Sequence, residues 1–202
     1  ESRDIAECSP LEGRLMGAYT EKKAVSTTYK TLNNNVPDSL IKLRINWEND
    51  TRQMEDIDWE AALMHLREVA IKARLRLIQL KILHRCYYDR KRLHRMGRAP
   101  SPKCLRCGCE EGTFIHTIWL CPQIQEYWRT IGEELNVILE ILIPLDPMYV
   151  LLGIPNDVDA PRHRLLFSNL GLVVVKRDIA RLWGERESPT LGEWKRGMDM
   201  YM

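Results

Sequence analysis

Four of the chain's six cysteines and one of its five histidines fall within residues 103–122, KCLRCGCEEGTFIHTIWLCP. Cys104 and Cys107 form a Cys-x2-Cys pair, His116 follows after a gap of eight residues, and Cys121 follows after a further four. Zinc prefers thiolate and imidazole ligands, and four of them leave a tetrahedral ion no open position. The spacing therefore predicts a structural zinc site made by Cys104, Cys107, His116 and Cys121.

The spacing of His116 and Cys121 restricts the backbone conformation between them. His116 and Cys121 are five residues apart, which is roughly 140° on an ideal α-helix. They can share an ion only if the segment is irregular or lies at a helix start. Cys109 could replace Cys107, but Cys-x4-Cys is a poorer chelate, so we treat it as a bystander. Reduced buried cysteines and a disulfide remain as alternatives.

A basic segment runs directly into this motif. From Arg67 to Arg106 the chain has 13 Lys or Arg and 2 acidic residues, although the net charge of the whole chain is only +2. Such a density of cations predicts salt-dependent, weakly sequence-selective binding to a phosphate backbone. Tyrosines placed among cations can stack on unpaired bases. The residues expected to contact nucleic acid are Tyr87, Tyr88, Arg90, Lys91, Arg92, Arg95, Arg98, Lys103 and Arg106.

Two alternatives to this nucleic-acid interpretation stay open. The arginines could pair with the acidic side chains between Glu48 and Glu60, and the tyrosines could belong to the core. The chain could then be a zinc-stapled helical module that binds other proteins. Trp119 and Trp128 are expected to pack the zinc module against the neighbouring helix.

The elements that must position these residues are expected to be helices. Apolar side chains at steps of three and four (Leu63, Leu66, Ala70, Ala73, Leu77 and Leu80) predict one long helix from about Trp59 to about Met96, with Asp58 as its N-cap. Further helices are expected at 121–142 and 162–183, and a short one from Ser188–Pro189. A Pro-containing connection at 143–157 should hold a short apolar strand or turn. The fold class predicted is mainly α, an irregular helical assembly with the small Cys3His module between helices.

Length and composition fit this interpretation. The 202 residues are 45% apolar and 29% charged, which suits one domain or two small ones. We expect a partial N-terminal segment at the edge of a fragment (1–40), a helical basic segment (41–100), the zinc module (101–130) and a C-terminal helical segment (131–202). The longest nearly apolar run, 170–175, is too short to span a bilayer, and we expect no membrane partner. No secretion signal is recognisable, so the cysteines are expected in a reducing compartment, where clustered thiols favour metal.

The sequence carries no recognisable catalytic motif. The chain has no Asp-Asp pair, no Gly-rich phosphate loop and no His-Glu-x-x-His sequence. We therefore expect this piece not to be an enzyme.

The segment from Tyr87 to Trp128 resembles a known family. Its basic-aromatic lead, Cys-x2-Cys-Gly, Gly-Thr-Phe-x-His, Cys-Pro and following Trp occur in the same order as in the zinc-binding segment of LINE-type non-LTR retrotransposon reverse transcriptases. Trp47-Glu48, IPLDPMYVLLGI and SPTLGEW extend the resemblance more weakly over residues 40–200.

The resemblance implies a position after the polymerase thumb, in a helical "wrist" and C-terminal segment that grips template RNA and target DNA. It implies the same four zinc ligands, and Cys109 departs from the commonest pattern. Reverse transcriptase catalytic domains would then be partners in cis in a longer chain. The implied localisation is the nucleus and cytoplasm, within a ribonucleoprotein particle.

Overall fold

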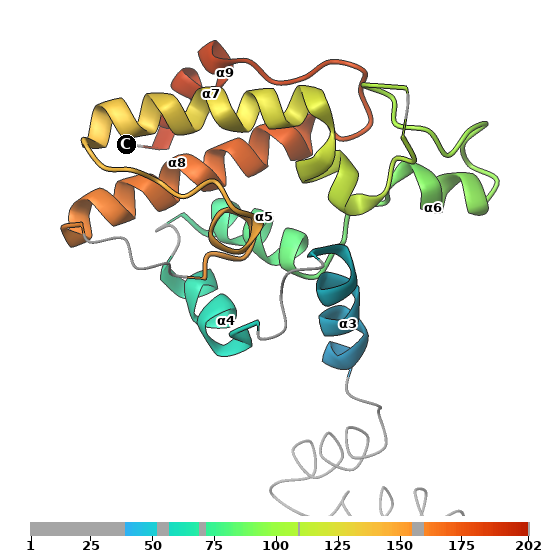
Figure 1. Cartoon of the computed structure of the whole chain (residues 1–202), viewed down its shortest axis with the longest axis horizontal. Helices are drawn as coiled ribbons and strands as arrows, with labels where there is room; N and C mark the ends of the chain where they lie inside the picture. Colours follow the sequence, from blue (N-terminus) through green and yellow to red (C-terminus); the bar gives the residue numbers. More distant parts are fainter. Residues whose placement is uncertain (1–38, 52–56, 69–71, 109, 155–159, 202) are drawn as a thin grey trace, which may run out of the picture. The chain divides into compact units, whose positions relative to one another are not determined.

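A computed structural model describes residues 39–51, 57–68, 72–108, 110–154 and 160–201 (Figure 1). The chain divides into two units between Asn46 and Trp47, and each is described by itself. The elements are α3 (Ser39–Thr51), α4 (Trp59–Glu68), α5 (Ala73–Leu83), α6 (Arg90–Arg95), the π-helical turn η1 (His116–Leu120), α7 (Pro122–Leu139), the π-helical turn η2 (Met148–Leu152), α8 (Arg162–Arg181) and α9 (Leu191–Tyr201). Over the described ranges the protein is mainly helical and has no β-strand, which confirms the predicted fold class. The predicted division into four segments stays a prediction.

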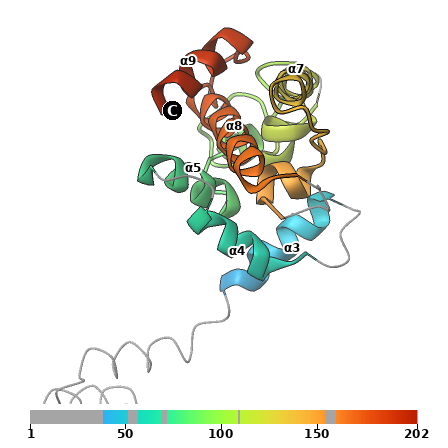
Figure 2. The ribbon, with the colours of Figure 1, turned by 90° about the vertical axis from the view of Figure 1, so that its left-hand side faces the viewer.

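Helix α8 lies at the centre of the second unit. It packs against α5, α7 and α9 (Figures 1 and 2). Residues 171–176 of α8 are all buried, and three of them are consecutive valines. Valine is a modest helix former, so packing on several sides, and not intrinsic propensity, stabilises this helix.

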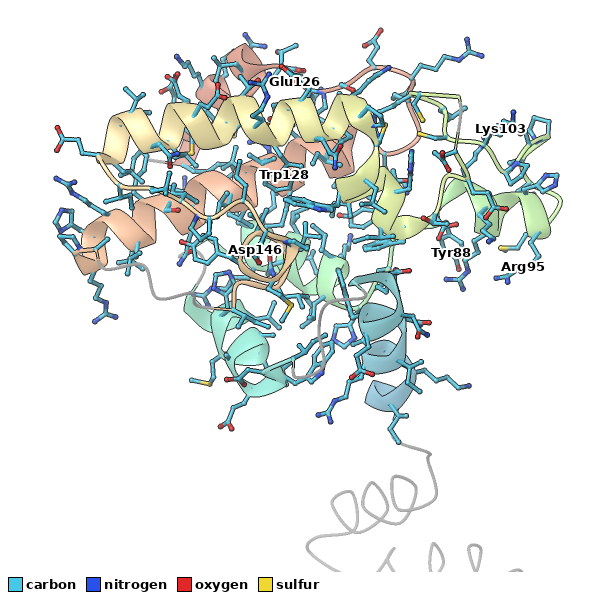
Figure 3. The ribbon with its side chains drawn as sticks, in the orientation of Figure 1. Tyr88, Arg95, Lys103, Glu126, Trp128 and Asp146 are labelled. Atoms are coloured by element: carbon cyan, nitrogen blue, oxygen red, sulfur yellow. The ribbon has the colours of Figure 1, made fainter. Side chains whose placement is uncertain are left out.

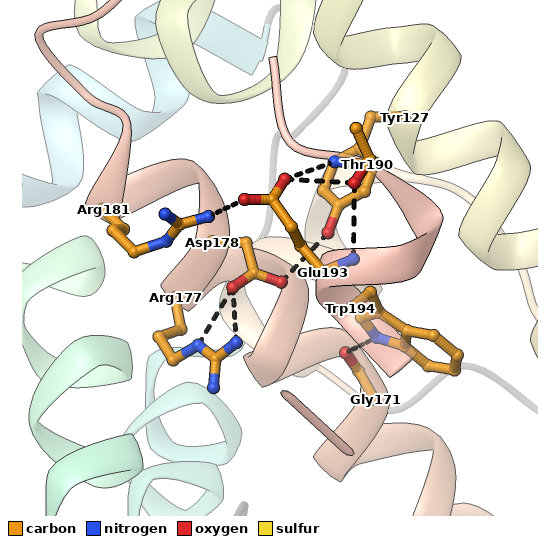
Figure 4. Close-up of polar contacts among 8 residues, drawn as sticks. All are labelled: Tyr127, Gly171, Arg177, Asp178, Arg181, Thr190, Glu193 and Trp194. Atoms are coloured by element: carbon orange, nitrogen blue, oxygen red, sulfur yellow. Dashed lines mark hydrogen bonds and ion pairs between the residues drawn. The ribbon is translucent and has the colours of Figure 1, made fainter. Parts of the chain in front are cut away.

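Polar contacts tie α8 to its neighbours inside this core (Figure 4). The Tyr127 hydroxyl of α7 donates to Asp178 of α8 at 3.1 Å, and the Arg177 guanidinium pairs with the same carboxylate at 2.5 Å. Burial raises the pKa of Asp178, while Arg177 opposes that rise. The indole of Trp194 in α9 donates to the carbonyl of Gly171 at 3.0 Å. Each buried polar group in this group of contacts thus has a partner.

The prediction of one long helix over residues 59–96 is wrong. Three helices replace it, because α5 ends at Leu83, Arg85 adopts a left-handed backbone with φ +52°, and α6 starts only at Arg90. The side chain of Asp89 accepts the amide of Arg92 at 2.7 Å and so caps α6. The predicted cap at the start of α4 is confirmed, since Asp58 accepts the amide of Ala61 at 2.9 Å.

The apolar stripe predicted for that helix also differs. Leu63, Leu77 and Leu80 are 40%, 47% and 39% exposed. Because the break lets α5 turn against α8 and η2, its buried apolar residues are instead Leu75, Ile82 and Leu83.

The remaining elements follow the predictions more closely. Helices α7 and α8 lie where two helices were expected. The expected strand or turn after α7 is the π-helical turn η2. The last helix begins at Leu191 rather than at Ser188–Pro189, because Thr190 and Glu193 form a capping box at its start. The Thr190 hydroxyl accepts the Glu193 amide at 3.3 Å, and the Glu193 carboxylate accepts the Thr190 amide at 2.9 Å (Figure 4). Among the helices described, none is long and apolar enough to cross a membrane.

Candidate metal centre

The four side chains predicted as metal ligands meet at one point. The thiol sulfurs of Cys104, Cys107 and Cys121 and a ring nitrogen of His116 all lie within 4.8 Å of one another. The Sγ atoms of Cys104 and Cys121 are 3.9 Å apart, and Sγ of Cys107 is 3.4 Å from Nε2 of His116. Sulfurs about 2.3 Å from a tetrahedral ion are separated by about 3.8 Å, so the donor set fits one metal ion. A disulfide, with sulfurs about 2 Å apart, does not link Cys104 and Cys121.

The first two ligands lie on a tight turn. The Gly108 amide donates to the carbonyl of Cys104 at 3.0 Å, and Gly108 has φ +70°, a conformation that glycine adopts without strain. The Cys104 amide donates to Glu110 at 2.8 Å, next to a β-bridge that joins Lys103 and Glu111. These bonds bring both thiols to the same side of the turn. Cys109 lies outside the described residues.

The turn is joined to α6 through Gly112. Its amide donates to Pro102 at 2.8 Å, and its carbonyl accepts the Lys91 amide of α6 at 3.1 Å. A Cβ atom at this position would lie only 2.8 Å from the Cβ of Arg90 and 3.2 Å from the Cα of Cys104. The absence of a side chain at Gly112 therefore lets α6 lie directly against the metal-binding turn.

The last two ligands come together through η1. In this π-helical turn the Cys121 amide donates to the carbonyl of His116 at 2.8 Å, an i to i+5 bond. The wider turn brings two residues five apart onto the same side, as the sequence required. The hydroxyl of Thr113 accepts the His116 amide at 3.2 Å and fixes the start of the turn.

Burial shifts the pKa of two of the candidate metal ligands. Burial raises the pKa of Cys121 to about 11, although the amides of Gln123 and Ile124 at the start of α7 lower it. Burial also lowers the pKa of His116, which keeps the imidazole neutral and able to ligate. A metal ion would supply the positive charge that three thiolates need, two of them buried, and would so couple metal binding to folding.

Arg106 was predicted to contact nucleic acid, but in the structure its side chain is buried. It is only 8% exposed, and its guanidinium donates to three backbone carbonyls, at 3.3 Å to Thr117, 2.7 Å to Leu182 and 3.1 Å to Glu187. Because these bonds join the metal module to the segment after α8, Arg106 is a structural residue and does not belong to an exposed interface.

The other predicted contacts separate into two groups. Tyr88, Lys91, Arg92, Arg95, Arg98 and Lys103 are exposed, and we call these six residues the basic face. Figure 3 shows Tyr88, Arg95 and Lys103 around α6. The other two, Tyr87 and Arg90, are half-buried. The Tyr87 ring lies 5.1 Å from the ring of Trp183, so it packs within the protein.

Neighbouring charges and rings modify this surface only slightly. Arg92 lies over the ring of Tyr88 at 4.4 Å, and Lys91 pairs with Glu111 at 2.5 Å where both side chains are exposed. An exposed ion pair of this kind contributes about 0–1 kcal/mol. Arg85 does pair with the upstream acid Asp50, so neutralisation by the acidic segment applies to that arginine.

The two tryptophans expected to pack the metal module do so. Trp128 of α7 is buried, and its indole donates to the carbonyl of Ile118 in η1 at 2.9 Å. The rings of Trp119 and Trp128 lie 5.7 Å apart. Figure 3 shows Trp128 pointing from α7 into the protein.

Trp183 is a residue that sequence reasoning missed. It lies 5.3 Å from the Phe114 ring, and its indole donates to the Tyr88 carbonyl at 2.9 Å. It thereby joins the segment after α8 to the residues just before α6 and to the metal module. Trp183 lies 62 residues beyond Cys121, the last residue of the cysteine motif, and nothing in the sequence around it indicates that it packs there.

A scan against models of known protein families finds none that matches this chain. The resemblance to LINE-type reverse transcriptases therefore depends on the motif residues alone.

Proposed function

We propose that this chain is a zinc-stapled nucleic-acid-binding segment. One observation carries the proposal: the metal-binding turn is hydrogen-bonded to the helix that bears the exposed cations, through the Lys91 amide and the carbonyl of Gly112 at 3.1 Å. An ion that fixes the turn would fix the position of α6 as well.

Zinc is the metal that best suits this donor set. Three thiolates and one imidazole in a tetrahedral arrangement are typical of structural zinc sites, whereas calcium and magnesium prefer oxygen ligands. The four protein ligands would complete the coordination, so the ion would hold the fold and leave no position for a substrate.

The basic face supports phosphate binding. Between Arg85 and Glu111 the chain has 8 basic and 3 acidic residues, and of these acids Asp89 is used as the cap of α6. Five of the six residues of the basic face are cations, and each such cation in contact with a phosphate would release a counterion. Tyr88 is 47% exposed and could stack an unpaired base beside them.

The motif resemblance supports an origin in a LINE-type reverse transcriptase. On this proposal the chain has no catalytic role, binds template RNA or target DNA, and works beside polymerase domains located elsewhere in a longer chain. The proposed localisation is then the nucleus and cytoplasm, in a ribonucleoprotein particle.

Fluorescence anisotropy with a labelled single-stranded RNA, across a salt series, tests the nucleic-acid proposal. We expect steep salt dependence, and we expect the double change Arg95→Gln/Arg98→Gln to reduce the slope of log K against log salt by about 0.7 for each phosphate that is no longer neutralised. The matched control is Arg129→Gln/Arg162→Gln, which removes two exposed arginines from α7 and α8. Equal effects of the two double changes would show that the basic face is not the binding surface.

A protein-interaction module is the second candidate, and a specific observation favours it. Val137 and Leu142, at and just after the C-terminal end of α7, are 78% and 82% exposed. Large exposed apolar patches often mark protein contacts, and these two side chains are only five residues apart in the sequence. Salt-insensitive or absent RNA binding would favour this candidate over the first.

A further inference from the structure

A small cavity lies beside the metal centre, and one of the candidate metal ligands, Cys104, contributes to its wall. Its volume is about 210 Å³, and its walls come from α6, from the turn after Cys104 and from the segment that follows α8. Sites for drug-sized ligands are about 300–1,000 Å³. This cavity is therefore suited to one flat ring and excludes a stacked pair.

Arg90, one of the residues that line the cavity, has an unsatisfied donor. Nε of Arg90 is buried and has no hydrogen-bond partner among the described residues. Leaving a buried donor unpaired destabilises the folded state, and does so more strongly when the group is charged. A ligand that accepts from the guanidinium of Arg90 would give this side chain a hydrogen-bond partner.

The other walls define what the acceptor belongs to. Tyr88 and Trp183 contribute aromatic surface, which favours a planar ring. Glu185 contributes a carboxylate, which would repel a phosphate but accepts hydrogen bonds from a ring N–H. Guanine offers both sets of groups, since O6 and N7 accept from arginine and its N1–H and N2–H₂ donate.

We infer that this cavity binds one unstacked guanine of a single-stranded nucleic acid, with Arg90 donating to the base and Glu185 accepting from it. The inference rests on the proposed nucleic-acid function and adds a base preference to it. The cations of the basic face would hold the phosphates on either side, whereas the cavity alone would distinguish the bases.

The test uses the zinc-loaded full chain and four labelled ten-residue RNAs, made of uridine except for a central G, A, C or U. We expect the G-containing RNA to bind about tenfold more tightly than the other three, the size of one good base contact. Glu185→Gln should reduce this preference to less than about threefold. Glu187→Gln is the matched control, because it makes the same charge change at an exposed position two residues away that does not line the cavity.

A second measurement does not depend on the variants. Titration with guanosine monophosphate, followed by ¹⁵N NMR, should shift the Arg90 Nε–H and Trp183 indole N–H signals, while adenosine monophosphate should leave them nearly unchanged. Equal shifts with both nucleotides would contradict the inference.

The outcomes separate the two proposals. Equal, salt-dependent affinity for all four RNAs would overturn the guanine site and leave the proposed function standing. A guanine preference that survives Glu185→Gln, or that Glu187→Gln removes equally, would also overturn it. No binding to any RNA at low salt would overturn both.

Discussion

The metal module and the three-helix core of α7, α8 and α9 are stabilised by different means. The core buries Trp128, Leu135 and Trp194 almost completely and surrounds α8 with apolar contacts. In the first half of the metal module, residues 103–112, the buried side chains described are only those of Cys104 and Arg106. Apolar burial can hold the core together, whereas this turn has few apolar contacts and relies on hydrogen bonds and, on the proposed function, on a metal ion.

The two regions also differ in the charged groups that they bury. The core contains Lys176, which is fully buried and donates to the side chain of Gln79. The module instead gathers three thiols, whose charge in the thiolate form needs a cation. Perturbing one region at a time should therefore give effects of different kinds.

The largest effect should come from the metal ligands. Cys104→Ser, or removal of zinc by a chelator, should abolish stoichiometric zinc binding and raise hydrogen exchange at the amides of Cys104, Gly108 and Gly112 to loop-like rates. The core around α8 should keep its protection. Cys86→Ser is the control, because Cys86 is an exposed free thiol outside the cluster. Unchanged exchange in the metal-free module would show that the ion is not structural.

A substitution in the core should lower the stability of the fold and leave zinc binding unchanged. Leu135 is fully buried, and a Leu135 methyl group lies 2.9 Å from where a Cβ of Gly171 would be. Leu135→Ala should lower the free energy of unfolding by about 2–5 kcal/mol, measured by urea denaturation, without changing the zinc content. Val137→Ala, at a 78% exposed position, should stay within about 0.5 kcal/mol. Loss of zinc in Leu135→Ala would mean that the two regions fold as one.

The buried lysine should make the core sensitive to pH. Burial lowers the pKa of Lys176 to about 7, below its value in the unfolded chain. Burial also lowers the pKa of His65, and the nearby Lys176 adds to that shift. Between pH 7 and about 10.4 the unfolded chain binds more protons, so this residue makes stability rise with pH. Lys176→Met should be more stable than the parent by ~2 kcal/mol at pH 7, and the difference should shrink towards pH 10. A difference independent of pH, in denaturation curves at both values, would contradict the buried charge.

The smallest effect is expected at the start of α9. Thr190→Ala removes one half of the capping box with Glu193 and should cost about 1 kcal/mol of unfolding free energy. Thermal unfolding measures it, and Thr190→Ser, which keeps the hydroxyl, is the control. Equal losses in both variants would mean that the cap does not stabilise the helix.

The sequence predicted which residues form the metal cluster better than it predicted the backbone conformation that brings them together. Residue types and gaps were sufficient to select Cys104, Cys107, His116 and Cys121, because metal chemistry restricts both. The π-helical turn that joins His116 to Cys121 was expected only as an irregularity, since its i to i+5 bond leaves no pattern in residue types.

The errors lie where tertiary contacts decide. The break after α5 contains neither glycine nor proline, and the one local signal was Asp89, a good N-cap residue just before α6. Arg106 looked like its basic neighbours, and only the fold shows that three distant carbonyls take up its guanidinium. Charge alone therefore could not separate the basic face from a structural arginine.

The most direct test of a metal module that positions the basic face is RNA affinity, measured by anisotropy on the same sample with zinc, after chelation, and after zinc is restored. We predict steeply salt-dependent binding that is lost on chelation and recovered with one equivalent of zinc per chain. Affinity and salt dependence that stay unchanged in a sample shown to be free of zinc would contradict the claim that the metal module positions the basic face.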